Sequence, residues 1–241
     1  MTKTDQLNML FEKWEKDNRC GDDFNVGEFI RDGIIDESEY SNQKIKVLFI
    51  SNEANGGKKH IYDKNRDEPL DRRELFMNYH KTNEESWSGR LKERVSCLYQ
   101  VVINDYSKNP YEVANCFAFM NLNKYAGEQK TDISHIEEFC KAYICYIKKE
   151  IEIIYPDIII WLAYNTFEEG TKIIGAKKNI LTIGSKSVPI IRTWHTSYHC
   201  IPKNKPKLHK FDTNDNIKYN DLVDKHAYNL YVELKNIDFY K

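Results

Sequence analysis

Residues 46–57 read KVLFISNEANGG, a run of branched and aromatic side chains that ends in polar residues and two glycines. A short, continuous apolar run is typical of a strand that is covered on both faces. Three later runs share this pattern, and polar residues follow each of them: EVANCFAFM at 112–120, DIIIWL at 157–162 and VPIIRTW at 188–194. The pattern predicts a small sheet that is buried on both sides.

Amphipathic segments lie between and around these runs. Helices are predicted at residues 1–16, 87–103, 133–154, 165–174 and 215–237, the third with an N-cap at Thr131-Asp132. Residues 180–185 predict a hairpin ahead of the last strand, and residues 60–83 a long loop or a loosely attached helix.

Strands that alternate with helices favour parallel pairing. We therefore expect an α/β protein, a three-layer α/β/α sandwich around a small parallel four-stranded sheet. One domain is predicted over residues 1–241, with its core at about 45–200 and a helix appended at each end.

Composition restricts the class of protein. Hydrophobic residues make up 41% of the 241, which is enough for a substantial core. Neither a signal peptide nor a membrane span is visible, so we expect a cytoplasmic protein without a membrane partner. The six cysteines form no C-x-x-C pair and are predicted to be free thiols. With a net charge of −1, a nucleic acid would have to bind a local basic patch.

Parallel strands bring their carboxyl-terminal residues to one edge of the sheet, where α/β proteins bind ligands. Each predicted strand is followed by residues able to do chemistry. They are Asn52, Glu53 and Asn55 after the first, Asn121 and Lys124 after the second, Asn165 and Thr166 after the third, and His195 and Ser197 after the last. The sequence therefore predicts carboxamides, a carboxylate and an imidazole at one edge.

Four segments resemble, in order, the motifs of the uracil-DNA glycosylase superfamily. VLFISNEANGG is similar to the family's strand and loop VLFVGEAPG, and FAFMNLNK to a strand that ends in Asn-x-x-Lys. IIYPDIIIWLAYNTFEE resembles its Pro-Asp strand, and TWHTSYH its His-Pro-Ser motif. The set spans residues 46–199. The resemblance implies hydrolysis of the N-glycosidic bond of a base flipped out of DNA, leaving an abasic site, without metal or cofactor.

The resemblance also implies roles for single residues. Breaking the bond makes the leaving base anionic, so a donor at the base oxygen lowers the barrier; His195 matches this donor. Asn121 matches the amide that reads the base edge. Glu53 would hold the attacking water, or Asn52 or Asn55 would do so instead. Asn55 and Ser197 would contact the base, and Trp87 would be its aromatic platform, with Phe76, Tyr198 and Trp194 as alternatives. Each also has a structural reading as a strand-end, capping or core residue.

Basic residues after the last motif, together with two earlier in the chain, predict the contact with DNA phosphates. The predicted nucleic-acid-binding residues are Lys203, Lys205, Lys207, Lys210, Lys124 and Arg90. A lysine-rich loop that serves only solubility is the alternative for the first four.

Several positions depart from the family pattern. Asn52 replaces a glycine, Asn55 and Thr196 replace prolines, and Tyr125 stands where the iron–sulfur branch has a cysteine. An iron–sulfur cluster is therefore not expected. The identity of the excised base is left open. Two alternatives remain: a non-catalytic module that binds nucleic acid or a nucleotide, and a hydrolase of free nucleosides or nucleotides. The setting would be DNA repair or defence against foreign DNA, and a monomer is expected.

Overall fold

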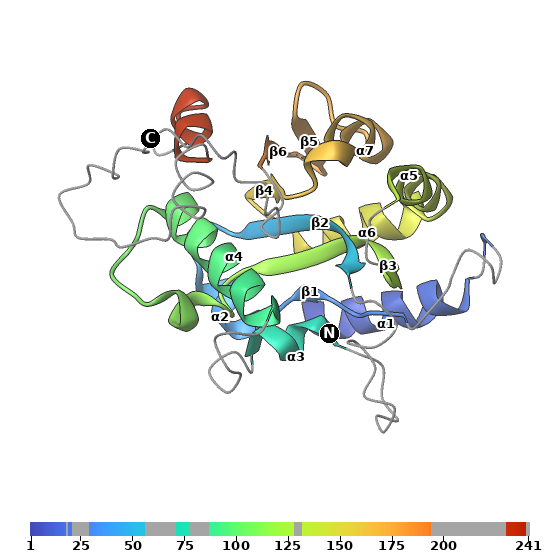
Figure 1. The fold of residues 1–241 in the computed structure, drawn as a ribbon, viewed down its shortest axis with the longest axis horizontal. Helices are drawn as coiled ribbons and strands as arrows, with labels where there is room; N and C mark the ends of the chain where they lie inside the picture. The colour runs from blue at the N-terminus through green and yellow to red at the C-terminus, as the bar shows by residue number, and fades with distance from the viewer. Residues whose placement is uncertain are drawn as a thin grey trace.

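A mixed six-stranded sheet forms the centre of the protein (Figure 1), within the residues that the computed structural model describes: 1–17, 19–20, 29–55, 71–77, 87–127, 132–193 and 230–239. Its spatial order is β1-β3-β2-β4-β6-β5. The strands are β1 (Gly33–Ile34), β2 (Val47–Asn55), β3 (Ala118–Gly127), β4 (Ile158–Trp161), β5 (Ile180–Ile183) and β6 (Lys186–Arg192).

The four predicted strands all exist, and neighbours among them pair in parallel. The prediction of a four-stranded parallel sheet is nevertheless wrong, because β1 and β5 extend the sheet as antiparallel strands at its two edges. The β5–β6 hairpin was predicted and is confirmed. β1 was missed because its two residues are too few to show any periodicity.

The order of the parallel strands places β2 at the centre, with β3 on one side and β4 on the other. The chain therefore leaves β2 in one direction and later returns on its other side. In open α/β sheets, ligands bind outside the carboxyl ends of the strands at such a reversal. A ligand site is therefore expected at the carboxyl ends of β2, β3 and β4.

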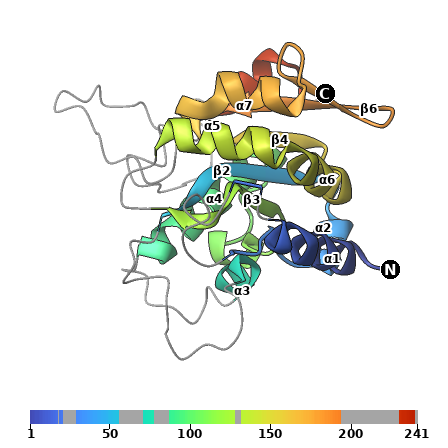
Figure 2. The same ribbon diagram turned by 90° about the vertical axis from the view of Figure 1, so that its right-hand side faces the viewer.

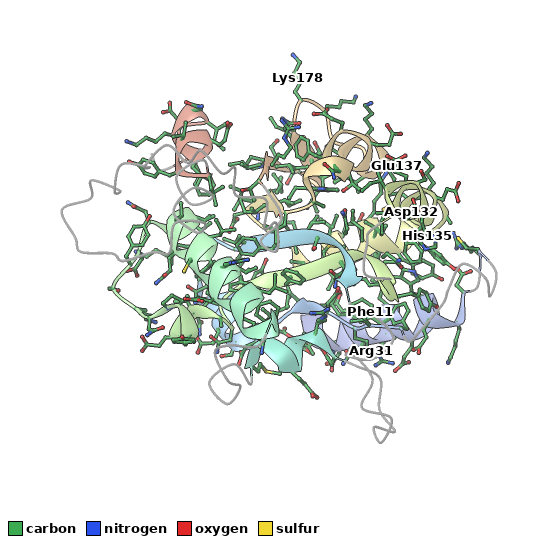
Figure 3. All side chains as sticks on the ribbon, in the orientation of Figure 1. Phe11, Arg31, Asp132, His135, Glu137 and Lys178 are labelled. Carbon is green, nitrogen blue, oxygen red and sulfur yellow. The ribbon has the colours of Figure 1, made fainter. Side chains whose placement is uncertain are left out.

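One face of the sheet packs against α1 (Lys3–Lys16), α5 (Ile133–Ala142), α6 (Ile144–Ile154) and α7 (Phe167–Ile174), which lie together in Figures 1 and 2. Leu7, Phe11 and Trp14 of α1 are fully buried, and Figure 3 shows Phe11 pointing into this layer. A capping box at Thr2 begins α1. The first helix is thus part of the core.

The predicted helix 133–154 is two helices. The predicted N-cap is confirmed, since Asp132 Oδ1 accepts hydrogen bonds from the backbone N–H groups of Ser134 and His135. At Tyr143 the backbone leaves helical geometry, with φ −107° and ψ 19°, and α6 begins at the next residue. The buried Tyr143 ring packs 4.5 Å from that of Phe139, so apolar spacing continues through the break.

The other face packs against α4 (Trp87–Ile103), α3 (Arg72–Met77) and helical residues 230–236. The bounds of α4 agree with the prediction. α3 lies inside the segment expected to be a loop or a loose helix, but the Phe76 ring packs 5.5 and 5.3 Å from those of Phe117 and Phe119. This part of the segment is therefore firmly attached.

Three short elements complete the description: α2 (Glu37–Asn42), η2 (Pro110–Val113) and η3 (Tyr164–Thr166). The helices in the described ranges include none that is long and apolar enough to cross a membrane.

Candidate functional site

The β2–β3 ladder brings two of the predicted motifs side by side. Its register places Ser51 opposite Asn121 and Glu53 opposite Asn123. The register then shifts between Glu53 and Asn55, so that Asn55 lies opposite Gly127. Neighbouring strands lie about 4.8 Å apart. The backbone of the first motif therefore lies next to that of the second, as the sequence predicted.

The side chain of Asn52 on β2 is held by a hydroxyl group of η3, the turn that follows β4. Thr166 Oγ1, fully buried in η3, donates a hydrogen bond of 2.7 Å to Asn52 Oδ1. The same oxygen accepts a bond of 3.3 Å from Nε1 of the buried Trp161 on β4. This chain fixes the orientation of the Asn52 carboxamide, and a fixed amide is what positioning a water molecule requires.

Asn121 is held by a carboxylate that the sequence did not reveal. Asp32 Oδ2 accepts hydrogen bonds from the Asn121 backbone N–H at 2.7 Å and from its Nδ2 at 3.4 Å. Asn121 is only 2% exposed, so its amide is oriented by the protein. Asp32 directly precedes the two-residue β1, a segment without a recognisable pattern.

Lys124 does not contribute to a surface for nucleic acid. Its side chain is completely buried, with Nζ bonded to Asp32 Oδ1 and lying 2.8 Å from Glu150 Oε2. Nζ also lies 5.4 and 5.3 Å from the ring centres of Phe11 and Trp14. The prediction that Lys124 binds phosphate is therefore wrong, because two internal carboxylates take up the ammonium.

The buried cluster Lys124, Asp32 and Glu150 contains one more acid than base. Burial raises the pKa of Glu150 well above its ordinary range, and the charge of Asp32 adds to this effect, although Lys124 opposes it. A raised pKa favours the protonated acid. The cluster then holds one ion pair and a neutral carboxyl group, a combination that avoids an unpaired buried charge.

Two further cations lie on the α4 side of the sheet, and neither was predicted. Arg72 of α3 is 6% exposed and Lys92 of α4 is 2% exposed. Burial lowers the pKa of Arg72 to about 10, opposed by the charge of Asp32. Burial also lowers the pKa of Lys92 to about 8, and the positive charge of Arg72 lowers it further. The two side chains are thus close enough to repel each other.

The remaining predicted site residues cannot be placed by their side chains. His195, Ser197 and the lysines at 203, 205, 207 and 210 lie outside the described residues. Glu53 and Asn55 on β2, and Trp87 and Arg90 on α4, have described backbones only. β6 ends at Arg192, followed by the buried Thr193, whose N–H donates to Trp161 O at 2.9 Å.

Metal ligands do not cluster in the described part of the chain: no three His, Cys, Asp or Glu residues there are placed to hold an ion. Asp132, His135 and Glu137, labelled in Figure 3, lie at the start of α5 or just before it.

Comparison with known proteins gives no relative from which a role could be taken: no family model matches the chain, and no curated protein matches it either. The functional assignment therefore depends on the residues and their geometry.

Proposed function

We propose that the protein is a monofunctional DNA glycosylase of the uracil-DNA glycosylase type, built as a three-layer sandwich. It would hydrolyse the N-glycosidic bond of a uracil-like or modified base flipped out of DNA. The observation that carries the proposal is the β2–β3 register, which sets Glu53 and Asn121 on adjacent parallel strands just beyond the level at which β4 ends, next to each other as the ordered motifs require. The central position of β2 adds support.

The chemistry assigns a task to each group. Asn121, oriented by Asp32, pairs with the base edge through its amide. Glu53 and the fixed Asn52 hold the attacking water near the sugar as it becomes cation-like. His195 donates a hydrogen bond to the oxygen of the leaving base, where negative charge develops.

With Lys124 inside the protein, contact with DNA falls to the other basic residues. Arg90 and the lysines at 203, 205, 207 and 210 would neutralise phosphates on either side of the flipped nucleotide. A flipped base also needs a stacking partner, for which we propose Trp87.

The test is base release from oligonucleotides. Single-stranded and duplex substrates carrying uracil, hypoxanthine, xanthine or a modified pyrimidine are incubated with the purified protein. Abasic sites are revealed by alkali, and the released base is identified by mass spectrometry. We expect cleavage after alkali only. A panel in which every substrate stays intact would contradict the proposal.

Variants assign the chemistry to the site. Loss of a transition-state hydrogen-bond donor, or of a general base, typically costs about 100-fold or more in rate, so His195→Ala and Glu53→Gln should each lose at least that much. Glu152→Gln is the matched control, because Glu152 is an exposed carboxylate paired with Lys149 on α6. Its activity should equal that of the unchanged protein.

A hydrolase of free nucleotides is the second candidate, and the net charge of −1 favours it, because the protein as a whole does not attract the extended DNA backbone. The two candidates differ in salt dependence, since affinity for DNA falls steeply with salt. Release of base from a nucleoside monophosphate, but not from DNA, would select the second.

A further inference from the structure

Asp32 is a buried carboxylate whose two oxygens have different partners. Oδ1 accepts a hydrogen bond from Lys124 Nζ. Oδ2 accepts from Asn121, whose backbone N–H lies at 2.7 Å and whose side-chain Nδ2 lies at 3.4 Å. Asp32 is 1% exposed, so bulk water does not compete for either oxygen. The ammonium of Lys124 therefore holds one side of the carboxylate and leaves the other side turned toward Asn121.

The backbone on both sides of Asp32 is attached to β3. β1 begins at the next residue and pairs with β3, with Gly33 opposite Phe119. Two residues before Asp32, the N–H of Ile30 donates to Lys124 O at 2.7 Å. The carboxylate of Asp32 is therefore fixed beside β3 by main-chain hydrogen bonds that flank it.

A carboxylate accepts hydrogen bonds but cannot donate them, and this restricts the Asn121 carboxamide. The amide has a donor end, Nδ2, and an acceptor end, Oδ1. With Nδ2 toward Asp32 a hydrogen bond forms. With the amide turned by 180°, Oδ1 would face the carboxylate oxygen of Asp32 inside the protein, and neither oxygen would have a donor there. Only one of the two orientations of the amide is thus favourable.

The orientation of an amide matters because related bases carry donors and acceptors in opposite order. Uracil and hypoxanthine have a lactam edge, with a ring N–H beside a carbonyl. Cytosine and adenine have an amidine edge, with an unprotonated ring nitrogen beside an amino group. An amide that turns over freely pairs with both edges, one in each orientation. A fixed amide pairs with one edge and rejects the other.

We propose that Asp32 is the positioning residue that gives the site its base specificity, by holding Asn121 in the orientation that pairs with a lactam edge. Asp32 acts through Asn121 and not on the base directly. The assignment to a base edge rests on the proposed function, whereas the control of the Asn121 amide by Asp32 does not.

Glu150 offers a matched control for Asp32. It is also fully buried, and its Oε2 lies 2.8 Å from Lys124 Nζ, but in the described part of the chain it makes no hydrogen bond with Asn121. Removing either acid leaves one carboxylate and one ammonium in the cluster. Asp32→Asn and Glu150→Gln therefore change the charge of the cluster equally, and only the first changes the contact with Asn121.

The first experiment uses no substrate. The side-chain amide of Asn121 is followed by NMR in full-length protein labelled with ¹⁵N at asparagine, and its hydrogen exchange is compared with that of the exposed Asn104. Exchange at Asn121 should be slow in the parent and in Glu150→Gln. It should be about tenfold faster or more in Asp32→Asn, because the hydrogen bonds to the carboxylate are lost. Equal exchange rates in Asp32→Asn and the parent would overturn the inference.

The second experiment measures base specificity. Base release is compared between oligonucleotides that carry uracil or cytosine, and hypoxanthine or adenine, at the same position. The parent should prefer the lactam base of each pair by about 100-fold or more, because the amidine base leaves buried polar groups unpaired. Asp32→Asn should lower this ratio by about tenfold or more, since asparagine both donates and accepts and so tolerates either orientation of Asn121. Glu150→Gln should keep the ratio.

The ratio separates positioning from a structural role, which would lower both rates together. Base release with an unchanged ratio in Asp32→Asn, or with equal rates for both bases in the parent, would overturn the inference and leave the proposed function standing. Asp32-dependent exchange at Asn121 without release of any base would refute the proposed function, and with it the base assignment, but not the control of Asn121 by Asp32. If Asp32→Asn does not fold, the parent still decides, because exchange at Asn121 as fast as at Asn104 would overturn the inference.

Discussion

Replacing Lys124 with methionine tests the buried cluster directly. Methionine keeps an apolar stem of similar length but removes the ammonium that bonds Asp32 and lies 2.8 Å from Glu150. Two buried acids then face each other without a cation. Removing one member of a buried ion pair costs about 3–5 kcal/mol. For a chain of this size each kcal/mol lowers the melting temperature by about 2–4 °C, so a fall of about 6–20 °C is expected.

The measurements are thermal unfolding for the melting temperature and urea unfolding for the free energy, both at pH 7 and followed by circular dichroism, with Lys149→Met as the control. Lys149 also pairs with a glutamate, Glu152 at 3.1 Å, but both side chains are more than half exposed. Such a pair contributes less than about 1 kcal/mol. If Lys124→Met were no more costly than its control, the buried ion pair would not exist as described.

Three further substitutions test other parts of the description. Lys92 has a pKa of about 8 in the folded chain against an ordinary 10.5, so the unfolded chain binds more protons between these values. Lys92→Met should therefore be more stable than the parent at pH 7, by up to about 3 kcal/mol. Urea titrations should show this difference in stability vanish as the pH rises from 8 to 10.5. A difference that stayed constant over this pH range would contradict the lowered pKa. Thr166→Val removes the hydroxyl between Asn52 and Trp161, so it should lower the stability measured by thermal unfolding by about 1–3 kcal/mol and reduce base release. Thr166→Ser keeps the hydroxyl and should retain most of the stability and most of the activity. Equal losses in the two variants would show that the hydroxyl is unimportant. Gly170→Ala places a methyl group against the ring of Trp161, at Cζ2, closer than van der Waals contact allows. It should lower the stability in the same unfolding measurement by about 1–3 kcal/mol, despite the better helix propensity of alanine. A more stable variant would rule out this contact.

The central strands were predictable because burial on both faces leaves continuous apolar runs. Their bounds were less so. The second run was expected at 112–120, whereas β3 spans Ala118–Gly127. Val113 and Cys116 are buried from a 3-10 turn and the bend after it, which gives the same apolar pattern as a strand. Conversely, β3 continues through the polar Asn121 and Lys124, because Asp32 satisfies both inside the protein.

The candidate site was predictable only where the sequence placed it near strand ends. Asn52, Glu53 and Asn121 were expected to follow the strands, and they lie instead within β2 and β3, beyond the level at which β4 ends. Asp32, Arg72 and Lys92 were not predicted, because sequence reading assigns isolated charges to the surface. Their burial results from contacts between segments far apart in the chain, such as the bond between Asp32 and Lys124, and no local period records such contacts.

The outermost strands of the sheet also affect how the protein behaves among other chains. β1 has two residues and β5 has four. The unpaired backbone N–H and C=O groups of an edge strand can pair with a strand of another molecule, and a longer edge strand has more of them. Because β1 and β5 are short, cross-β fibre growth from the folded state should be slow even at high protein concentration. Lengthening β1 by design would be the change most apt to promote such growth.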